Sequence, residues 1–253
     1  MKTAIISPIP LLEKYATLSD SYHLVLTHLI LQEPEYVSFY KKLSRQGHYI
    51  ILDNSAHEFG NSFKIEQLER AAKLVEPSEI TLPDRLFFGD DTYRQSKEAI
   101  SILRKTFPTV KFMGVPQGRH VEEFMECLQN LSLLGIDTVG LSKDYEVWEG
   151  GLVGLVKRIH SVCPRRDIHL LGWGRDLKQL WTLSRLKGYN IRGIDSAKPL
   201  VYASCGIRLD LNDAEYPGRT EEFFYLKDID DDLARDNIKY FQFLARGKFY
   251  EYV

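Results

Sequence analysis

Short apolar runs alternate with amphipathic stretches along most of the chain. Each apolar run ends in a cluster of polar residues or glycines, and a stretch with apolar residues at helical spacing follows. The run from His23 to Leu31 is apolar almost throughout, which is typical of a strand buried on both faces of a parallel sheet. Strands are therefore predicted at Thr3–Ser7, His23–Leu31, Tyr49–Leu52, Glu79–Leu82, Lys111–Val115, Ile136–Leu141, Ile168–Leu171 and Asn190–Ile194.

The stretches between these runs have the spacing of amphipathic helices. Val121, Phe124, Leu128 and Leu131 make one apolar stripe, and Gly47 ends the first strong helical pattern. Eight strands that alternate with helices through short connections predict a closed (β/α)8 barrel, a TIM barrel, rather than an open sheet. The helices are expected at about 34–46, 64–75, 90–106, 120–134, 148–162 and 176–186, with a weaker one at 11–18.

The pattern changes beyond Asp210. Residues 212–220 are rich in turn formers, and Leu233–Ala245 is an amphipathic helix. We interpret about 210–253 as a C-terminal extension packed on the barrel. A chain of 253 residues with 44% hydrophobic content and no Ser/Gly/Pro-rich linker is expected to form one domain, 1–253.

Charge and cysteine content narrow the class of protein. The 33 Lys and Arg nearly balance the 35 Asp and Glu, so bulk positive charge cannot hold this protein on nucleic acid, although a local patch can. The three cysteines form no CxxC pair, which favours reduced thiols and a cytoplasmic protein, with Cys127 as a packed thiol. No apolar segment reaches the roughly 18–20 residues of a membrane span. No Cys/His cluster has metal-ligand spacing, and no cofactor is expected.

Carboxylates stand where several predicted strands end. Asp53, Asp84 and Asp195 have this position, and Gln117 follows another strand. In a barrel of parallel strands these ends meet on one face, where the active sites of TIM barrels lie. One carboxylate can attack a sugar carbon, and another can move a proton or accept hydrogen bonds from an N–H edge. Each Asp taken alone is as easily explained as a helix cap or a loop anchor, but three with Gln117 favour a shared pocket.

The same segments, taken in order, carry a family resemblance. It rests on Leu52-Asp53-Asn54-Ser55-Ala56-His57-Glu58-Phe59-Gly60, Leu82-Pro83-Asp84, Gly114-Val115-Pro116-Gln117-Gly118, Leu171-Gly172-Trp173-Gly174 and Gly193-Ile194-Asp195. Together they resemble the tRNA-guanine transglycosylase superfamily, and most closely its phage and bacterial members that insert 7-deazaguanine bases into DNA. The resemblance covers about Leu24 to Cys205. It implies a TIM barrel that breaks a guanine N-glycosidic bond and joins a deazapurine to the same sugar.

The resemblance also implies roles for individual residues. Asp53 matches the general acid/base, and Asp84 and Gln117 match residues that read the guanine edge. Gly140 falls where a backbone group meets the base. Asp195 is the expected nucleophile, although the tRNA enzymes place theirs three residues beyond the Gly-Ile-Asp start, which is Lys198 here.

Further residues are expected around the substrate. We place Asn54, Leu141, Gly172 and Trp173 in the base pocket, where Trp173 either stacks on a base or packs on the barrel. Arg175, Lys198, Arg208 and Arg219 are candidates for phosphate contacts, although each alone is better explained as a solvated charge. Pro199 favours extended or turn geometry at Lys198.

Departures from the tRNA enzymes set the expected partners. This chain lacks their C-terminal zinc cluster of three Cys and a His, and Ser55-Ala56 replaces two glycines. These differences favour DNA and a free 7-deazaguanine base as partners. Three alternatives stay open: a related enzyme acting on tRNA, a non-catalytic nucleic-acid-binding barrel, and a phosphate-handling TIM-barrel enzyme, which the absence of a clear Gly-rich anion loop weakens.

Overall fold

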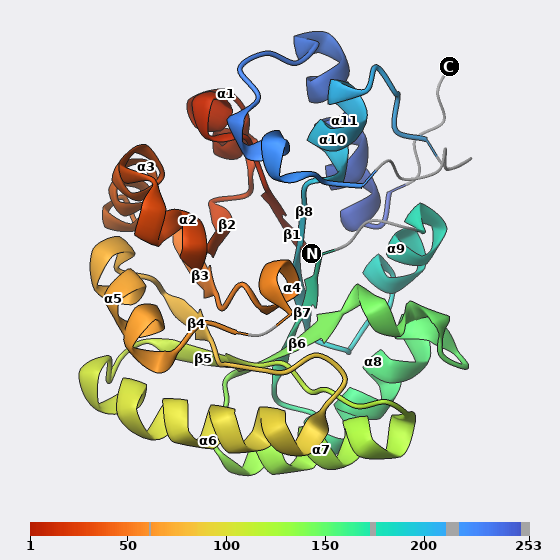
Figure 1. Cartoon of the computed structure of the whole chain (residues 1–253). Coiled ribbons are helices and arrows are strands. Elements are labelled where there is room, and N and C mark those ends of the chain that lie inside the picture. The colour runs from red at the N-terminus through yellow and green to blue at the C-terminus, as the bar shows by residue number, and fades with distance from the viewer. Residues whose placement is uncertain (61, 173–175, 211–217, 249–253) are drawn as a thin grey trace.

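Eight parallel strands form a barrel surrounded by helices (Figure 1). The structure is a computed structural model that describes residues 1–60, 62–172, 176–210 and 218–248. The sheet order is β1-β8-β7-β6-β5-β4-β3-β2, so each strand from β2 to β8 pairs with its neighbour in sequence. The prediction of a (β/α)8 barrel is confirmed. The strands are β1 (Lys2–Ile5), β2 (Tyr22–Leu26), β3 (Tyr49–Asp53), β4 (Glu79–Thr81), β5 (Lys111–Gly114), β6 (Thr138–Ser142), β7 (Asp167–Leu171) and β8 (Ile191–Ser196).

The helices lie outside the strands and bury their apolar stripes against them. In α7, Phe124, Leu128 and Leu131 are buried, as their spacing predicted. None of the helices in the described ranges is long and apolar enough to cross a membrane. The helices are α1 (Leu12–Tyr15), α2 (Thr27–Gln32), α3 (Pro34–Arg45), α4 (Ala56–Phe59), α5 (Ile65–Val75), α6 (Gly89–Thr106), α7 (Val121–Leu133), α8 (Gly151–Val162), α9 (Leu177–Ser184), α10 (Lys198–Ser204) and α11 (Asp231–Ala245).

The barrel closes between β1 and the segment just before β2 through two side chains and one backbone hydrogen bond, which the Asp20 N–H donates to the Thr3 carbonyl at 3.3 Å. The strands β1 and β2 lie side by side, but the described sheet has no ladder between them. The N–H of Thr3 donates instead to the Asp20 carboxylate at 3.0 Å, and the N–H of Ile5 donates to Ser19 Oγ at 3.0 Å. Because backbone donors away from water need partners, these two side chains replace the missing ladder and form the seam of the barrel.

Two predicted segments have a different structure. The strand expected over His23–Leu31 ends at Leu26, and α2 follows directly, because an uninterrupted apolar run does not distinguish a buried strand from a buried helix. The extended geometry expected at Lys198 is also wrong. Lys198 and Pro199 begin α10, where the missing N–H of proline removes no helical hydrogen bond.

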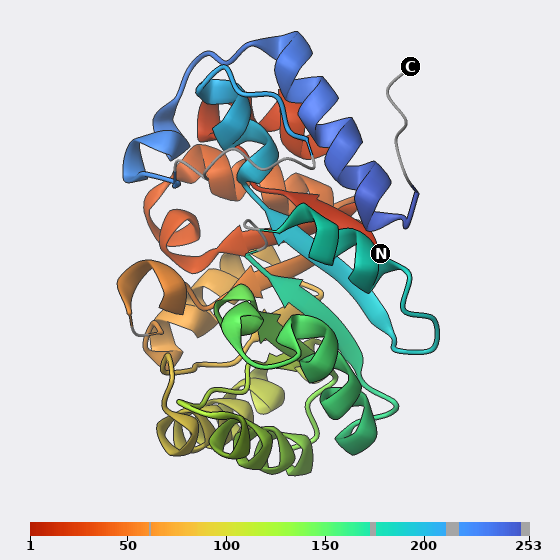
Figure 2. The ribbon, with the colours of Figure 1, turned by 90° about the vertical axis from the view of Figure 1, so that its right-hand side faces the viewer.

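The last helix, α11, packs against α9, α10 and β1, as Figure 2 shows. The buried Asn237 fixes this contact: its amide donates to the carbonyls of Pro199 and Ile207, and its oxygen accepts the N–H of Leu209 at 2.7 Å. α11 therefore packs on the barrel. Cys127 is buried, as expected for a packed thiol, and burial raises the pKa of that thiol to about 12.

Candidate active site

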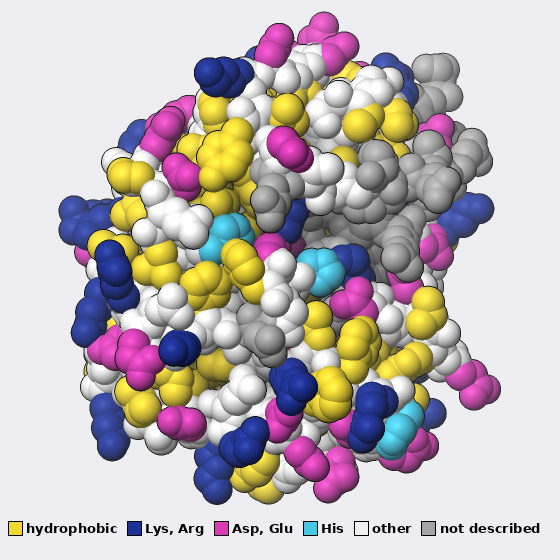
Figure 3. Space-filling model, in the orientation of Figure 1, with side chains coloured by type: hydrophobic (Ala, Val, Ile, Leu, Met, Phe, Trp, Pro, Cys, Tyr) yellow, Lys and Arg dark blue, Asp and Glu magenta, His cyan; other side chains and the backbone are white. Residues whose placement is uncertain are grey.

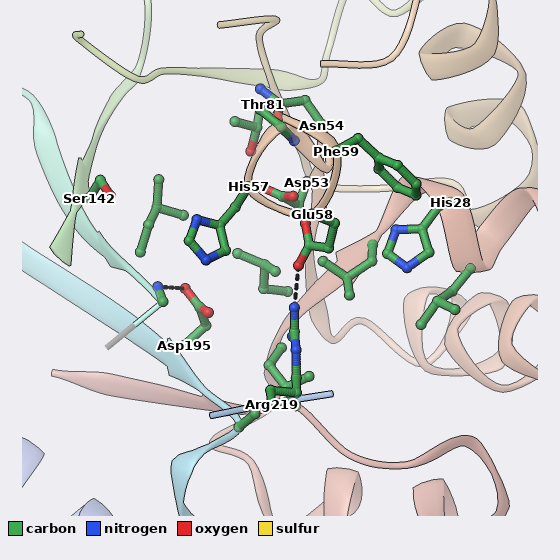
Figure 4. Close-up of a pocket in the computed structure, with 18 of the residues that line it drawn as sticks. His28, Asp53, Asn54, His57, Glu58, Phe59, Thr81, Ser142, Asp195 and Arg219 are labelled. Carbon is green, nitrogen blue, oxygen red and sulfur yellow. Dashed lines mark hydrogen bonds and ion pairs between the residues drawn. The ribbon is translucent and has the colours of Figure 1, made fainter. Parts of the chain in front are cut away.

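A cavity of about 1130 Å³ opens at the carboxyl ends of the strands. Asp53, Asp84, Gln117 and Asp195 all line it, so the structure brings together the four residues whose positions at strand ends predicted a shared pocket. They come from β3, from the segments after β4 and β5, and from β8. Figure 4 shows Asp53 and Asp195 facing one cavity, with α4 lying over it.

Asp84 is held at the end of β4 by two amides. Its Oδ1 accepts from Asn54 Nδ2 at 2.6 Å, and its Oδ2 accepts from Gln117 Nε2 at 2.6 Å. A second hydrogen bond, accepted by the amide oxygen, fixes the orientation of each of these amides. Asn54 Oδ1 accepts the N–H of Ala56, and Gln117 Oε1 accepts the Tyr145 hydroxyl. Since the two oxygens of a carboxylate together have four lone pairs, Asp84 can still accept a hydrogen bond from a ligand.

Asp84 is only 3% exposed, and burial raises its pKa from 3.8 to about 6, against the two amide hydrogen bonds that lower it. The carboxylate form is therefore costly at this buried position. A ligand that offers N–H donors would lower that cost, so this position suits the edge of a heterocycle that carries N–H groups.

Asp53 ends β3, and its Oδ2 accepts the N–H of Ser55 at 2.7 Å. Ser55 has a left-handed backbone with φ of 58°, which turns the chain sharply from β3 into α4. Burial, and then the nearby Glu58, hold the pKa of Asp53 well above its usual range, and Asp195 and Asp84 add to this effect. A carboxyl group with a raised pKa is suited to donate a proton.

Asp195 lies on β8 and is 6% exposed. Its Oδ1 accepts two hydrogen bonds, from the Gly172 N–H at 3.1 Å and from His169 Nε2 at 3.1 Å (Figure 4 shows the first). No residue in the described part of the chain donates to Oδ2. One oxygen is thus fixed in place, and the other is left for chemistry in the cavity.

The cavity also contains polar residues that strand-end reasoning did not place there. Glu58 on α4 forms an ion pair with Arg219 from the C-terminal extension, and this pair spans the cavity (Figure 4). At the rim, His57 Nε2 lies 3.3 Å from Lys143 Nζ, and burial together with Lys143 lowers the pKa of His57. Arg219 is a predicted phosphate contact that lines the cavity, but its ion pair with Glu58, far away in the sequence, was not predicted.

Several predicted site residues lie elsewhere. Gly140 is on β6, where an added Cβ would be 2.8 Å from Leu171 Cδ1 and 2.9 Å from Met113 Sδ, so this glycine makes room for packing inside the barrel. Leu141 is buried in the core and does not line the cavity.

Among the predicted phosphate contacts, Lys198 is 1% exposed, with Nζ 5.0 Å from the centre of the Tyr202 ring, so it is not at the surface where a phosphate could reach it. Arg208 is exposed and pairs with Asp236 at 3.5 Å, but it does not line the cavity. Gly172 lines the cavity, as predicted. Trp173 and Arg175 lie outside the described residues. Within the described ranges, no three His, Cys, Asp or Glu side chains form a group that could hold a metal ion.

Comparisons with known proteins show the fold of this chain. A scan against protein-family models and a search of the curated proteins found no match. The chain is similar to the solved structure of a D-psicose 3-epimerase in the presence of D-fructose, with 15% identity and a TM-score of 0.56 over 98% of this chain and 100% of that chain. It is also similar to active domain 2 of a chitinase from Pyrococcus furiosus, with 12% identity and a TM-score of 0.52 over 91% and 88% of the two chains. The likeness is one of fold. A shared fold does not set the chemistry, which depends on the residues of this chain's own cavity.

Proposed function

We propose that this protein is a base-exchanging transglycosylase that removes guanine from DNA and inserts a 7-deazaguanine base through a covalent Asp195–sugar intermediate. One observation carries the proposal: a single cavity holds Asp195, a carboxylate with one fixed oxygen and one that accepts from no donor among the described residues, and Asp53, a carboxyl group with a raised pKa. Two carboxyl groups in different environments are what a two-step displacement at a sugar carbon requires.

The proposed reaction uses the two groups in turn. Asp195 Oδ2 attacks C1′ of the nucleotide, and the C1′–N9 bond breaks with its electron pair moving to the departing guanine, which takes the proton of Asp53. The incoming base then returns a proton to Asp53 as its own nitrogen attacks C1′. Asp195 leaves with the electrons of the ester bond, so the carboxylate is regenerated and nothing is oxidised or reduced.

Asp84 and Gln117 support a purine-like base as the ligand. The free lone pairs of Asp84 point to the edge of a heterocycle with two adjacent N–H groups, which guanine and 7-deazaguanine both have. The same pocket can therefore read the departing and the incoming base. Asn54 would act by holding Asp84 in place rather than by reading the base itself.

Exposed aromatic side chains on the barrel face support a nucleic-acid partner. Phe59, Phe87, Phe88 and Tyr225 are each at least 40% exposed, and all lie in segments that follow strands or in the extension. The guanidinium of Arg85 lies 4.3 Å from the centre of the Phe88 ring, and hydrophobic and basic side chains lie close together on this face in Figure 3. Exposed aromatic and Arg planes are surfaces on which unpaired bases stack.

Two measurements test the proposal: formation of the covalent protein–DNA adduct and incorporation of labelled base into DNA. Asp195→Asn is expected to bind base and DNA but to form no covalent protein–DNA adduct on a denaturing gel and to incorporate no labelled base. Asp53→Asn is expected to slow incorporation by about 10²–10⁴, the range for a lost general acid/base. Asp144→Asn, at the rim of the same cavity, is the matched control and should keep both properties.

DNA and RNA oligonucleotides of one sequence are compared in the same assay. An Asp195→Asn variant that still forms the adduct would refute the assignment of the nucleophile. Exchange on RNA alone would replace DNA with RNA as the substrate.

A further inference from the structure

A chain of buried hydrogen bonds runs from Asp195 down through the inside of the barrel. His169 Nε2 lies 3.1 Å from Asp195 Oδ1, and His169 Nδ1 lies 2.7 Å from the Tyr22 hydroxyl. Arg192 Nε donates to the same hydroxyl at 3.2 Å. These residues come from β8, β7 and β2, so the chain crosses the barrel interior beneath the cavity.

The available donors and acceptors fix which atom donates in each of these hydrogen bonds. A guanidinium can only donate, so the oxygen of Tyr22 accepts from Arg192. The buried hydroxyl proton of Tyr22 has no other acceptor among the described residues, so it points to His169 Nδ1, which accepts it. The ring proton of neutral His169 is therefore on Nε2, where it is donated to Asp195 Oδ1.

None of the three lower residues is placed to touch a substrate. His169 is 0% exposed and Tyr22 is 1% exposed, and neither they nor Arg192 are among the described residues that line the cavity. Burial raises the pKa of Tyr22, so its phenol keeps the proton that it donates to His169. Gly193 makes room for the phenol, because a Cβ there would lie 2.5 Å from Tyr22 Cε1.

The lower end of the chain is fixed by an ion pair. Arg192 Nη2 pairs with Glu79, a fully buried carboxylate on β4. Its Nη1 donates to Thr138 Oγ1 and to the Tyr49 hydroxyl, each at 3.1 Å. The ion pair with Glu79 and the hydrogen bond to Thr138 leave the Nε that faces Tyr22 little freedom to turn away, with or without the Tyr49 hydroxyl.

We propose that Arg192, Tyr22 and His169 are positioning residues that fix His169 as its Nε2–H tautomer and thereby hold Asp195 Oδ1, so that Oδ2 is the attacking atom. This inference rests on the proposed function, in which Asp195 is the nucleophile. These hydrogen bonds set the orientation of the Asp195 carboxylate. Breaking them is therefore expected to lower kcat and to leave the binding of base and DNA unchanged.

The first measurement needs no activity. A long-range ¹H–¹⁵N correlation spectrum of the ¹⁵N-labelled protein at neutral pH reports which ring nitrogen of each histidine carries a proton. The His169 signals are identified by their absence from the spectrum of His169→Gln. Wild type is expected to show His169 protonated on Nε2 alone, and Tyr22→Phe should show a mixture of tautomers.

The second measurement is kinetic and uses a matched pair. Tyr22→Phe removes the hydroxyl that faces His169. Tyr49→Phe removes a hydroxyl from the same ion pair, on a ring that stacks on Tyr22 at 5.5 Å, but makes no contact with His169 in the chain. We expect kcat of base exchange to fall about 10-fold in Tyr22→Phe and to stay near wild type in Tyr49→Phe, with similar losses of thermal stability.

His169 itself supplies a rescue test. His169→Leu removes the donor to Asp195 and is expected to lower kcat by about 10²-fold, the effect of misplacing a reacting group by about 1 Å. His169→Gln places an amide N–H near the position of Nε2 and should recover most of that loss, with KM for the free base unchanged in both variants.

The outcomes separate this inference from the proposed function. A wild-type His169 protonated on Nδ1, or on both nitrogens, would overturn the directed chain. Equal losses of kcat in Tyr22→Phe and Tyr49→Phe would assign these hydroxyls a structural role only. A wild-type protein with the Nε2–H tautomer but without base exchange would refute the transglycosylase proposal and leave the hydrogen-bond chain supported.

Discussion

Replacing Asp84 by asparagine is expected to separate base binding from stability. Asp84→Asn keeps the shape of the side chain but cannot ionise. It presents one oxygen and one NH2 group to two donors, Asn54 Nδ2 and Gln117 Nε2, which now lie at 2.6 Å from carboxylate oxygens. One of these two amides then faces the new NH2 group and loses its acceptor. It cannot turn its own oxygen toward that group without breaking the hydrogen bond that the oxygen already accepts. A buried donor without a partner costs about 1–3 kcal/mol.

The ionisation of Asp84 acts in the opposite direction. Its pKa rises from 3.8 to about 6 on folding, which corresponds to about 3 kcal/mol at about 1.36 kcal/mol for each pKa unit. Because the folded-state pKa is raised, this contribution to stability is fully present below pH 3.8 and is lost as the pH rises through 6. Relative to Asp84→Asn, the free energy of unfolding of wild type should therefore fall by about 2–3 kcal/mol between pH 4 and pH 8.

Urea unfolding of both proteins across this pH range measures the difference directly. The two opposing effects nearly cancel at pH 8, so the variant should be about as stable as wild type there while binding free base much more weakly by calorimetry. Asp144→Asn serves as the control because Asp144 is a carboxylate at the cavity rim without a buried amide partner. A difference between wild type and Asp84→Asn that does not change with pH would refute the raised pKa and the account of the base pocket that depends on it.

Three further predictions concern other parts of the molecule. Burial lowers the pKa of His23 from 6.5 to about 4. The contribution of neutral His23 to stability is therefore present above pH 6.5 and is lost as the pH falls to 4. Over that range, unfolding curves should show the free energy of unfolding of wild type falling by about 3 kcal/mol relative to His23→Gln. Gly193→Ala forces a Cβ to within 2.5 Å of Tyr22 and should lower the free energy of unfolding by about 1–3 kcal/mol, whereas Gly154→Ala, with nothing nearer than 3.7 Å, should be neutral or stabilising. Elemental analysis should find no stoichiometric zinc, because the sequence has no Cys/His cluster with ligand spacing; one tightly bound zinc per chain would contradict this.

The strands could be predicted because each apolar run ends in a visible polar cluster. The same rule found Asp53, Asp84 and Asp195, since parallel strands bring their carboxyl ends to one face. It failed at α2, where the apolar run continues from strand into helix without a polar signal. It also failed at Lys198, because position in a motif does not show which side of a helix faces the core.

Residues that act across the fold left no local signal. Arg219 meets Glu58 from 161 positions away, and nothing in the sequence of either segment indicates the other. His169 did leave a trace, as the one polar residue within the apolar stretch Ile168–Leu171. Its role became visible only when the ladder between β7 and β8 placed it opposite Gly193, two residues before Asp195.

The seam between β1 and β2 has a consequence for how the barrel assembles during synthesis. β1 comes before the other strands of the barrel in the sequence, but its ladder is with β8, where Ala4 pairs with Asp195, so β1 has no ladder partner until Ser196 has been made. The other strands each pair with the strand made just before or after them. Contacts so distant in sequence slow folding, because closing the intervening chain costs entropy before the contact forms. A nascent chain that stops short of β8 can therefore neither close the barrel nor place Asp195 in the cavity, so the candidate site is complete only when this last ladder forms.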